Sequence, residues 1–398
     1  MCISLGFVVI SDELIVINLI NNIKYLLIIY FINCRVSVFQ CSVPTACVLG
    51  KPYPSKETHA TLACMGKNVG REDVAKAAGV SESTVSRALN NSPLISEEIK
   101  KKVRQAAEKL GYFPSRTATL FASNRSFAIG FVVPFYPSIM PFTRPYFPSL
   151  LDGLLLGSLE HNYTISIVFE NHLGRYRSYQ ELINSHSFDG LVFAITKDHF
   201  PELQPLIDHS LPFVLVNNYQ QGAASIYARP DVGMTKAFEH AIGLGHSHIG
   251  YITGDLQFKN GKDRLAMFEK LAAHHHCTTT IVEGNFSRSS GFDAFSQLRN
   301  GPSLVMTASD RQAFGFFQAC SEHTKRVPQD ISVIGYDNFQ PASTSAPPLT
   351  TVNHPITEMG KEAVLMLVSM IEQGRAGQQK WADTDFVIRK STTRYGGA

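Results

Sequence analysis

The feature that most constrains this chain is residues 70–91, which read GREDVAKAAGVSESTVSRALNN. The pattern predicts two short helices that meet at Gly79, because glycine is favoured where a helix ends in a residue with positive φ. Ser81 is expected to cap the second helix, which continues to about Leu89. The helices contain many small side chains, which allow their axes to approach closely. This spacing is that of a helix-turn-helix.

The second helix is expected to carry polar groups on the face away from this small core: Glu82, Ser83, Ser86 and Arg87. Side chains of this size fit the major groove of DNA. The charge distribution agrees, since residues 65–125 contain 11 Lys/Arg against 6 Asp/Glu, whereas residues 126–398 contain 21 against 24. A small basic module before a mildly acidic body favours polyanion binding by the module.

A third helix is predicted after Ser96, which is a suitable cap and is followed by acidic residues in the first turn. Its apolar face is marked by Ile99, Val103, Ala106 and Leu110, and Gly111 ends it. An ordinary helical hairpin on a larger domain is the alternative interpretation. Three capped helices, the basic balance and the separate body together favour a DNA-binding headpiece.

The body alternates apolar runs of strand length with helical segments. The runs are residues 127–134, 164–170, 190–195, 212–217, 248–254, 279–284, 303–309 and 331–338. Continuous apolar strands separated by helices indicate parallel sheets covered on both faces. Two such sets predict an α/β body of two lobes, each a doubly wound parallel sheet, behind an all-α headpiece.

Polar residues at the ends of these strands are candidates for a ligand site, because ligands in such folds bind at the carboxyl ends of the strands. The candidates are Asp231, Arg264, Asp310 and Asp337. An arginine with carboxylates can grip a polyol, and Phe286 and Tyr136 could stack on a sugar face. For each aspartate the alternative is a helix N-cap.

The headpiece residues carry a specific family resemblance. VAKAAGVSESTVSRALN, followed by SEEIKKKVRQAAEKLGYFPSRTA, resembles the headpiece of the LacI/GalR family of transcription regulators, and the likeness extends over about residues 68–394. It implies that Glu82, Ser83 and Arg87 face base edges, and that Ser81, Thr84, Ser86 and Asn90 hold phosphates. It also implies a hinge helix from Arg116 to Ala122, with Leu120 and Phe121 as the minor-groove wedge.

Three departures from the family pattern bear on these expectations. Gly70 and Arg71 stand where the family begins its first helix with Thr and an aliphatic residue. Phe121 replaces the usual Leu at the wedge. Ala194 and Ser309 occupy positions where some sugar-binding members carry Asn.

The resemblance also implies how the chain divides. The headpiece is expected at residues 66–115 and the hinge and linker at 116–125. The body is expected to have the fold of periplasmic sugar-binding proteins. Its N-lobe would comprise residues 126–244 with 352–382, and its C-lobe residues 245–351 with 383–398.

Residues 1–64 differ in composition from the rest and hold five of the seven cysteines. Residues 14–32 are long enough to cross a bilayer, but Asn18, Asn21, Asn22 and Lys24 interrupt them. Our preferred interpretation is a non-native extension before a true start at Met65, and the competing one is a membrane anchor. A peptide from residues 5–60 in the natively expressed protein would overturn our preference.

We therefore expect a cytoplasmic regulator, a repressor, that binds a pseudo-palindromic DNA operator as a homodimer and responds to a small-molecule effector, a sugar by preference. No cofactor, metal or catalytic group is expected. A sugar-binding receptor that is membrane-tethered or exported is the alternative, and a small-molecule enzyme using the cleft is a third. Membrane fractionation distinguishes the receptor, and a nucleophile–base pair in the cleft would favour the enzyme.

Overall fold

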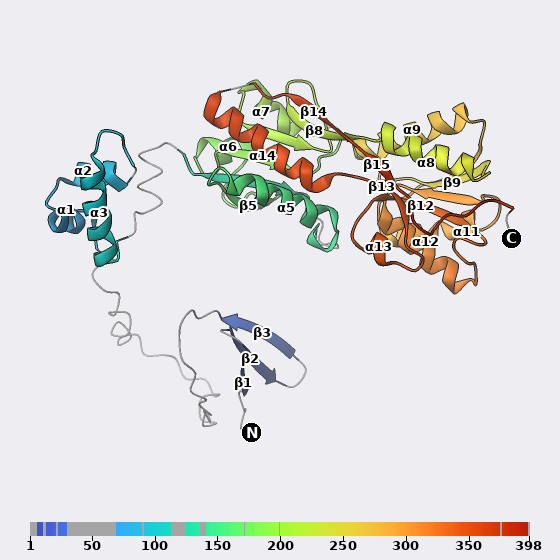
Figure 1. The fold of residues 1–398 in the computed structure, drawn as a ribbon, viewed down its shortest axis with the longest axis horizontal. Helices are drawn as coiled ribbons and strands as arrows, with labels where there is room; N and C mark the ends of the chain where they lie inside the picture. The colour runs from blue at the N-terminus through green and yellow to red at the C-terminus, as the bar shows by residue number, and fades with distance from the viewer. Residues whose placement is uncertain are drawn as a thin grey trace. The chain divides into compact units, whose positions relative to one another are not determined.

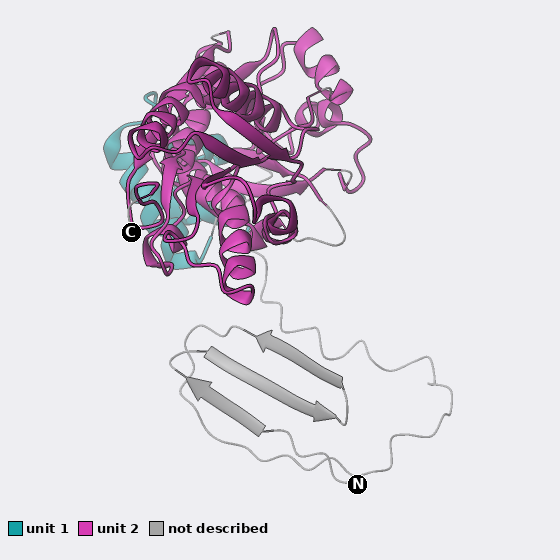
Figure 2. Cartoon of the chain, turned by 90° about the vertical axis from the view of Figure 1, so that its right-hand side faces the viewer, with its two compact units in different colours: residues 1–112 teal, residues 113–398 magenta. Residues whose placement is uncertain are grey.

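The structure is a computed structural model. It describes the backbone of residues 6–10, 13–20 and 23–29, and the residues 69–89, 91–112, 125–135, 141–170, 172–198, 200–374 and 376–396. The predicted hinge helix at 116–122, Asn90 and Tyr136 lie outside these described residues. The chain divides into two compact units, Met1–Tyr112 and Phe113–Ala398 (Figure 2).

The amino-terminal backbone forms three antiparallel strands, β1 (Gly6–Ile10), β2 (Glu13–Ile20) and β3 (Ile23–Ile29). Two of these strands therefore occupy the stretch that is long enough to cross a bilayer. Within the part of the chain that the structure describes, no helix has the length and apolar character needed to span a membrane.

The headpiece consists of α1 (Arg71–Ala78), α2 (Glu82–Leu89) and α3 (Glu97–Leu110). Gly79 ends α1 with φ 65°, and the Ser96 hydroxyl caps α3 by accepting a hydrogen bond from the Ile99 amide, as predicted. One valine from each helix, Val74, Val85 and Val103, is completely buried in the shared core. On α3 the fully buried alanine is Ala107, and Ala106 is only partly buried.

Arg71 begins α1 at a position where the resemblance implied an aliphatic residue. The helix compensates through its cap, because the Asp73 carboxylate accepts a hydrogen bond of 2.8 Å from the Gly70 amide. An acidic residue in the first turn also interacts favourably with the helix dipole.

Two six-stranded sheets form the body (Figure 1). The N-lobe sheet contains, in spatial order, β14 (Gln379–Asp383), β8 (Ala224–Arg229), β7 (Phe213–Val216), β6 (Gly190–Phe193), β4 (Ala128–Val133) and β5 (Thr164–Phe169). The C-lobe sheet contains β10 (Thr278–Val282), β9 (His248–Ile252), β11 (Leu304–Thr307), β12 (Ser332–Asp337), β13 (Thr350–Asn353) and β15 (Asp385–Val387). All neighbouring pairs are parallel except β13 with β15.

Helices cover both faces of each sheet, so the predicted doubly wound architecture is confirmed. In the N-lobe, α5 (Tyr146–Leu159) and α14 (Ile356–Gln373) pack on one face, and α6 (Tyr179–Asn184) and α7 (Gln204–Asp208) on the other. Strand β4 shows the reason, because Ile129 and Phe131 face the first layer and Val132 faces the second.

The C-lobe repeats this arrangement with other helices. One face carries α8 (Asp231–Gly243) and α9 (Lys259–His274). The opposite face carries α11 (Phe295–Leu298), α12 (Asp310–Glu322) and α13 (Pro341–Thr344), and α10 (Arg288–Asp293) packs against α12. Two short 3₁₀ helices, η2 (Pro141–Thr143) and η3 (Pro201–Leu203), complete the elements.

The chain crosses between the lobes at places that differ partly from the expected boundaries. We expected the first crossing near residue 244, with α8 in the N-lobe. Helix α8 instead packs in the C-lobe core through Met234 and Phe238, so the chain crosses between β8 and α8. The second crossing follows β13, a few residues after the expected position, and the third lies between β14 and β15, close to residue 383 as expected.

Glycines allow the closest helix pair of the N-lobe to form. A Cβ on Gly153 of α5 would lie 2.0 Å from the Thr357 carbonyl oxygen, and one on Gly360 of α14 would lie 2.5 Å from the Leu150 carbonyl oxygen. These two helices therefore pack backbone against backbone, which fixes the position of α5 and of Tyr146 at its amino end.

Candidate functional site

Helix α2 presents a polar outer face and an apolar inner face. Val85 and Ala88 are buried in the headpiece core, whereas Glu82, Ser83 and Arg87 are exposed. Ser86 and Thr84 are partly exposed beside them. The sequence prediction that this helix turns a polar row outward is therefore matched by the burial pattern.

Ser81 caps α2, because the Thr84 amide donates a hydrogen bond of 3.2 Å to its hydroxyl oxygen. The same hydroxyl lies 2.8 Å from the hydroxyls of Ser83 and Thr84. Three hydroxyl groups thus cluster at the amino end of α2, where amide N–H groups and the helix dipole favour an anion such as a phosphate. Asn90, Leu120 and Phe121, the remaining predicted DNA contacts, lie outside the described residues.

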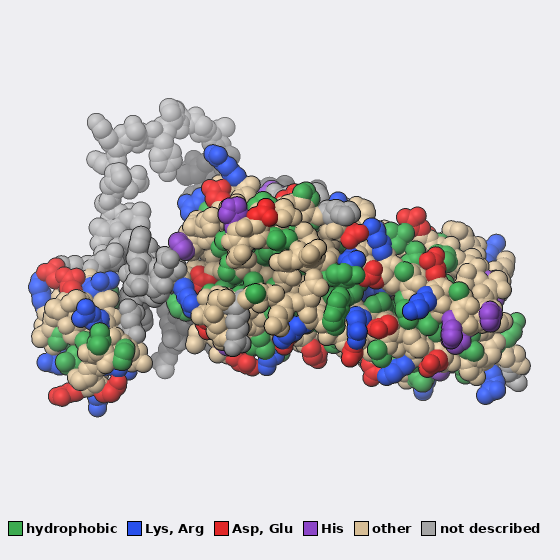
Figure 3. Space-filling model, turned by 90° about the horizontal axis from the view of Figure 1, so that it is seen from above, with side chains coloured by type: hydrophobic (Ala, Val, Ile, Leu, Met, Phe, Trp, Pro, Cys, Tyr) green, Lys and Arg blue, Asp and Glu red, His purple; other side chains and the backbone are tan. Residues whose placement is uncertain are grey.

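The surface of the body carries a mixture of positive and negative side chains. On the face shown in Figure 3, acidic and basic side chains of the body are interspersed and do not gather into one patch of a single sign. The mildly acidic balance of the body is therefore spread over that face and forms no single charged patch.

The body contains a cavity where the carboxyl ends of strands from both lobes meet. N-lobe residues Pro134, Tyr146 and Ile195 line it together with C-lobe residues Arg264, Phe286 and Asp337. The volume is about 90 Å³. This position agrees with the general rule for ligand sites in doubly wound sheets.

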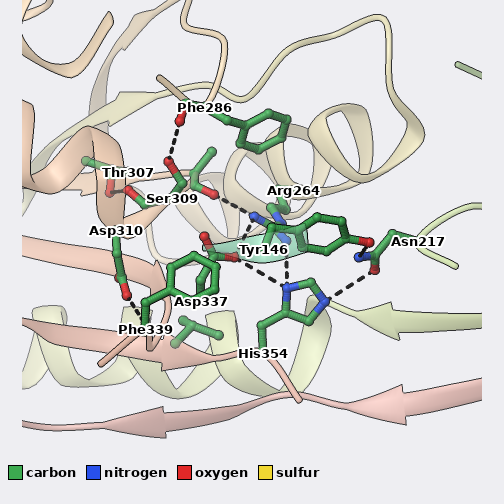
Figure 4. Close-up of polar contacts among 12 residues, drawn as sticks. Tyr146, Asn217, Arg264, Phe286, Thr307, Ser309, Asp310, Asp337, Phe339 and His354 are labelled. Atoms are coloured by element: carbon green, nitrogen blue, oxygen red, sulfur yellow. Dashed lines mark hydrogen bonds and ion pairs between the residues drawn. The ribbon is translucent and has the colours of Figure 1, made fainter. Parts of the chain in front are cut away.

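Arg264, on α9, is the central polar residue of the cavity and is only 4% exposed. Its Nη1 donates a hydrogen bond of 2.5 Å to the Ala308 carbonyl oxygen and lies 3.6 Å from Asp337 Oδ1. Its guanidinium carbon lies 3.6 Å from the centroid of the Tyr336 ring. Figure 4 shows the polar contacts of Arg264. The group is therefore held flat and charged at the wall of the cavity.

A directed chain of hydrogen bonds leads from Arg264 into the other lobe (Figure 4). Arg264 Nη2 lies 3.4 Å from His354 Nδ1, and His354 Nε2 lies 3.2 Å from Asn217 Oδ1. Asn217 Nδ2 then donates to the Tyr146 hydroxyl at 2.8 Å, and this hydroxyl donates to the Ala194 carbonyl oxygen at 2.6 Å.

The protonation states fit this direction. Burial, reinforced by the charge of Arg264, lowers the pKa of His354, so its ring is neutral and carries a single proton. With this proton on Nε2 the ring donates to Asn217 Oδ1, whereas with it on Nδ1 the ring donates to Asp337 Oδ1, which lies 3.4 Å away. Burial raises the pKa of the Tyr146 phenol, which therefore keeps its proton and remains a donor. The chain joins α9 and the end of β13 in the C-lobe to the ends of β7 and β6 and to α5 in the N-lobe.

Backbone strain is also found at this place. Asp337 at the end of β12 has φ 119°, and Asn217 and Phe286 have φ 55° and 63°. Non-glycine residues with such φ angles are costly and cluster at ligand sites. Phe286 and Asp337 line the cavity, and Asn217 belongs to the hydrogen-bond chain beside it.

The structure brings together three of the six predicted effector residues. Arg264, Phe286 and Asp337 line the cavity. Asp231 begins α8 and does not line it; its nearest ionic contact is Arg229, with 3.9 Å between Nε and Oδ1. Tyr136 lies outside the described residues.

Asp310 has a structural position and is completely buried, so our expectation of an effector contact is corrected. Its carboxylate accepts hydrogen bonds from the Phe339 amide at 2.9 Å and from the Thr351 hydroxyl at 2.5 Å. It therefore fastens the loop after β12 to β13. The helix cap at this point is Ser309, whose hydroxyl accepts from the Gln312 amide at 3.3 Å.

Sequence reasoning missed several lining residues, namely Arg144, Tyr146, Phe258, Asn260, Arg311, Phe339 and His354. His354 follows directly after β13 and could have been found by the strand-end rule that found Asp337. Arg144 precedes a helix, and no sequence pattern marks it. Across the residues that the structure describes, no cluster of three His, Cys, Asp or Glu side chains could hold a metal ion.

Comparisons with known proteins match both parts of the chain. Residues 72–115 match the family described as bacterial regulatory proteins, lacI family, and residues 238–392 match the periplasmic binding protein-like domain. The ribose operon repressor of Escherichia coli K12 is 31% identical over 333 residues, covering 81% of this chain and 98% of that protein.

Two further relatives agree. The transcriptional repressor PurR of Pectobacterium atrosepticum is 31% identical over 316 residues, covering 76% of this chain and 91% of that repressor. Among solved structures, the Lac repressor dimer bound to operator and the anti-inducer ONPF superposes with a TM-score of 0.71 at 25% identity. That superposition covers 82% of this chain and all of the Lac repressor chain.

Proposed function

This chain belongs to the lacI family of bacterial regulatory proteins, and on that premise we propose that α2 reads a DNA operator while the cavity between the lobes binds the effector that controls it. The protein is a DNA-binding transcriptional repressor with a periplasmic-binding-protein-like effector domain. It acts as a dimer on a DNA operator, so each half of a pseudo-palindromic site receives one headpiece.

The observation that carries the DNA-reading proposal is the division of α2 into two faces. Val85 and Ala88 are buried, and Glu82, Ser83 and Arg87 project from the opposite side. Arg87 makes no hydrogen bond or ion pair with any described residue, so its guanidinium is available to bind a guanine through two parallel hydrogen bonds. The hydroxyls at the start of the helix would hold a backbone phosphate and set the register.

We expect Arg87→Ala to lose sequence discrimination by about 1–3 kcal/mol, which is the range for one bidentate contact to a base. The operator would first be selected from a random duplex pool with the wild-type protein. Gel-shift titrations of that duplex and of a scrambled one then give the two affinities for each variant. The ratio of these affinities should fall in Arg87→Ala.

Arg87→Lys is the matched control because it keeps the positive charge and loses the planar fork. It should retain affinity for the scrambled duplex while losing most of the discrimination. If Arg87→Ala distinguished operator from scrambled DNA as well as wild type, the assignment of α2 as the reading helix would be wrong.

The cavity fits a small polyol. Arg264 and Asp337 provide a donor and an acceptor, and Phe286 and Phe258 provide aromatic walls. The buried Asn260 Oδ1 has no hydrogen-bond partner among the described residues and can accept from a ligand hydroxyl. A volume of about 90 Å³ is small beside the 300–1,000 Å³ of most ligand pockets, which favours a monosaccharide-sized effector.

A relative is a ribose operon repressor, so a sugar is the first effector class to test. Effector binding would change operator affinity through its different affinities for the two lobe arrangements. We infer that the cavity serves binding and not catalysis, and that the protein acts in the cytoplasm. The relatives are repressors and not enzymes, which supports the first inference.

A further inference from the structure

The amino end of α9 carries side chains with two different partners. Asn260 and Arg264 are four residues apart, so they share one side of the helix, and both line the cavity. Phe258, the residue before the helix, lines it too. Lys262 and Asp263 contact the N-lobe instead. The same turn of α9 therefore belongs both to the ligand site and to a connection between the lobes.

A lysine and a tyrosine make side-chain contacts across this junction. Lys262 Nζ donates a hydrogen bond of 2.7 Å to Asp198 Oδ2, in the segment after β6. The hydroxyl of Tyr227, on β8, donates to Asp263 Oδ2 at 2.8 Å. Burial and the negative charge of Asp263 raise the pKa of the Tyr227 phenol, which therefore keeps the proton that it donates. The tyrosine contact is the stronger, because the Lys262 side chain is 48% exposed.

The backbone joins the lobes at the same place. The Asp198 amide donates a hydrogen bond of 3.1 Å to the Gln257 carbonyl oxygen. Lys197 pairs with Phe258 in an antiparallel β-bridge. Phe258 thus belongs at once to the cavity wall and to the connection between the lobes. Each of these contacts joins two protein groups, so the connection does not depend on a ligand.

The N-lobe side of this connection is held by a buried amide. Asn218, after β7, donates from Nδ2 to the Thr196 hydroxyl at 2.6 Å and to the Lys197 carbonyl oxygen at 3.2 Å. It therefore ties the segment after β7 to the segment after β6. The Lys259 ammonium of α9 lies 4.1 Å from the centroid of the Tyr219 ring, which adds a cation–π contact between the lobes.

We propose that residues 257–263 form a strap that fastens the C-lobe to the N-lobe, and that Lys262 and Tyr227 are positioning residues for the effector. Neither of them lines the cavity. They act through Phe258 and Asn260, which the strap holds at the cavity wall. An effector that meets a fixed wall does not lose binding free energy to ordering it. This inference rests on the proposed function of the cavity as the effector site, and it adds residues outside the lining that set the affinity.

Hydrogen exchange of the full chain measures the strap without any ligand. The Asp198 amide donates across the junction, so its exchange should speed up when the strap is weakened. We expect an increase of about threefold in Lys262→Ala, typical of an exposed ion pair, and of about tenfold in Tyr227→Phe, typical of a hydrogen bond to a charged group. Lys262→Arg keeps the ion pair and should exchange as wild type does. Overlapping peptides analysed by mass spectrometry resolve this amide.

Lys236→Ala and Tyr251→Phe are the matched controls. Lys236 Nζ also forms an exposed ion pair, 2.6 Å from Asp385 Oδ1, but both residues belong to the C-lobe. Tyr251 is also buried and its ring stacks on Phe268 of α9, but its hydroxyl has no hydrogen-bond partner among the described residues. Both variants should leave the exchange of the Asp198 amide unchanged.

Calorimetric titration tests the positioning role. Ribose, glucose and galactose are titrated into the wild-type protein, and a sugar that binds is then titrated into the variants. The double variant Tyr227→Phe/Lys262→Ala should bind it about threefold or more weakly, because only molecules with a closed strap present the complete wall. Lys236→Ala and Lys262→Arg should bind it as wild type does, which separates positioning from a general loss of stability.

The outcomes separate this inference from the effector-site proposal. Equal exchange of the Asp198 amide in wild type, Lys262→Ala and Tyr227→Phe would overturn the strap. A sugar affinity that the double variant retains in full would overturn the positioning role. Faster exchange in the strap variants, without binding of any sugar to wild type, would support the strap and contradict the proposed sugar site.

Discussion

At the scale of single residues, the cavity is organised around one arginine whose position is over-determined. A backbone carbonyl, a carboxylate and an aromatic ring all hold Arg264, and the ring of His354 completes its surroundings. Because the Arg264 side chain is already ordered, a ligand that contacts it does not lose binding free energy to ordering this side chain.

The buried state of His354 predicts a pH dependence of stability. Its folded pKa lies below the ordinary value near 6.5, because burial and the charge of Arg264 disfavour the imidazolium. The unfolded chain therefore binds a proton that the folded chain refuses, and this residue makes the free energy of unfolding fall as pH drops below about 6.5. The limit is about 1.4 kcal/mol per pH unit for one proton.

Urea titrations of wild type and His354→Asn between pH 7.5 and 5 would measure this. The variant should lose less of its free energy of unfolding over that range, although it is less stable at pH 7.5. Burial raises the pKa of the Asp310 carboxyl, which acts in the opposite direction in both proteins and cancels in the comparison. His274→Gln, at an exposed histidine, is the control and should follow wild type. Parallel pH profiles of His354→Asn and wild type would contradict the prediction.

What the sequence could predict at this scale depended on how local the signal was. Arg264 and Asp337 were found because they follow apolar strands. Asp310 gave the same signal and was misassigned, because only the tertiary contact with Thr351 shows that its carboxylate turns inward. Arg144 and Arg311 were missed, since the approach of residues so distant in the chain is set by the packing of two lobes.

At the scale of elements, periodicity and apolar runs predicted the helices of the headpiece and most strands of both sheets. The short strands β13, β14 and β15 were not predicted. The lobe to which α8 belongs was not predicted correctly. Gly233 of α8 shows why: a Cβ there would lie 2.5 Å from Val352 Cγ1 and 2.7 Å from Thr384 Oγ1. Close contact with two segments more than 100 residues away assigns the helix to the C-lobe, and no local pattern carries that information.

Helix α5 and the edge strand β5 leave aliphatic side chains exposed. Leu156 and Leu159 are 52% and 74% exposed, and Ile167 on β5 is 45% exposed. We propose that a second copy of the chain covers this surface, since the chain is similar to a Lac repressor chain that was solved as a dimer on its operator. Exposed aliphatic side chains beside a sheet edge are typical of such interfaces.

Leu159→Asp should weaken the dimer by about tenfold or more, because it removes an apolar contact and places a charge in the interface. Sedimentation equilibrium would give the dimer dissociation constant, and operator affinity should fall with it at low protein concentration. Ile388→Asp is the control: Ile388 is 61% exposed and follows β15, at the edge of the C-lobe sheet away from β10. A dimer constant unchanged by Leu159→Asp would place the interface elsewhere.

At the scale of the whole molecule, the hydrogen-bond chain through His354, Asn217 and Tyr146 connects the effector site to both lobes. An effector that contacts Arg264 on one side and Tyr146 on the other bridges the same two lobes. An effector can shift the equilibrium between two lobe arrangements only if it binds one of them more tightly than the other. Its contacts at this junction between the lobes provide that difference in affinity.

Asn217 is the link to test, because it is 1% exposed and bonds to a residue from each side of the junction. Asn217→Ala should reduce by about fivefold the factor by which effector changes operator affinity, which is the worth of about one hydrogen bond. Fluorescence anisotropy with saturating and zero effector gives this factor. Calorimetry with and without operator duplex must give the same factor for effector affinity, because coupling is reciprocal.

Ser225→Ala is the matched control for that experiment. Ser225 is also completely buried in the N-lobe, but its hydroxyl has no hydrogen-bond partner among the described residues. Its loss should leave the coupling factor unchanged. If Asn217→Ala behaved like Ser225→Ala, with effector still bound, the lobes would communicate by packing or by other contacts between them, such as Lys262 with Asp198 and Tyr227 with Asp263. A smaller factor measured equally from the operator side and the effector side would instead locate the communication in this hydrogen-bond chain.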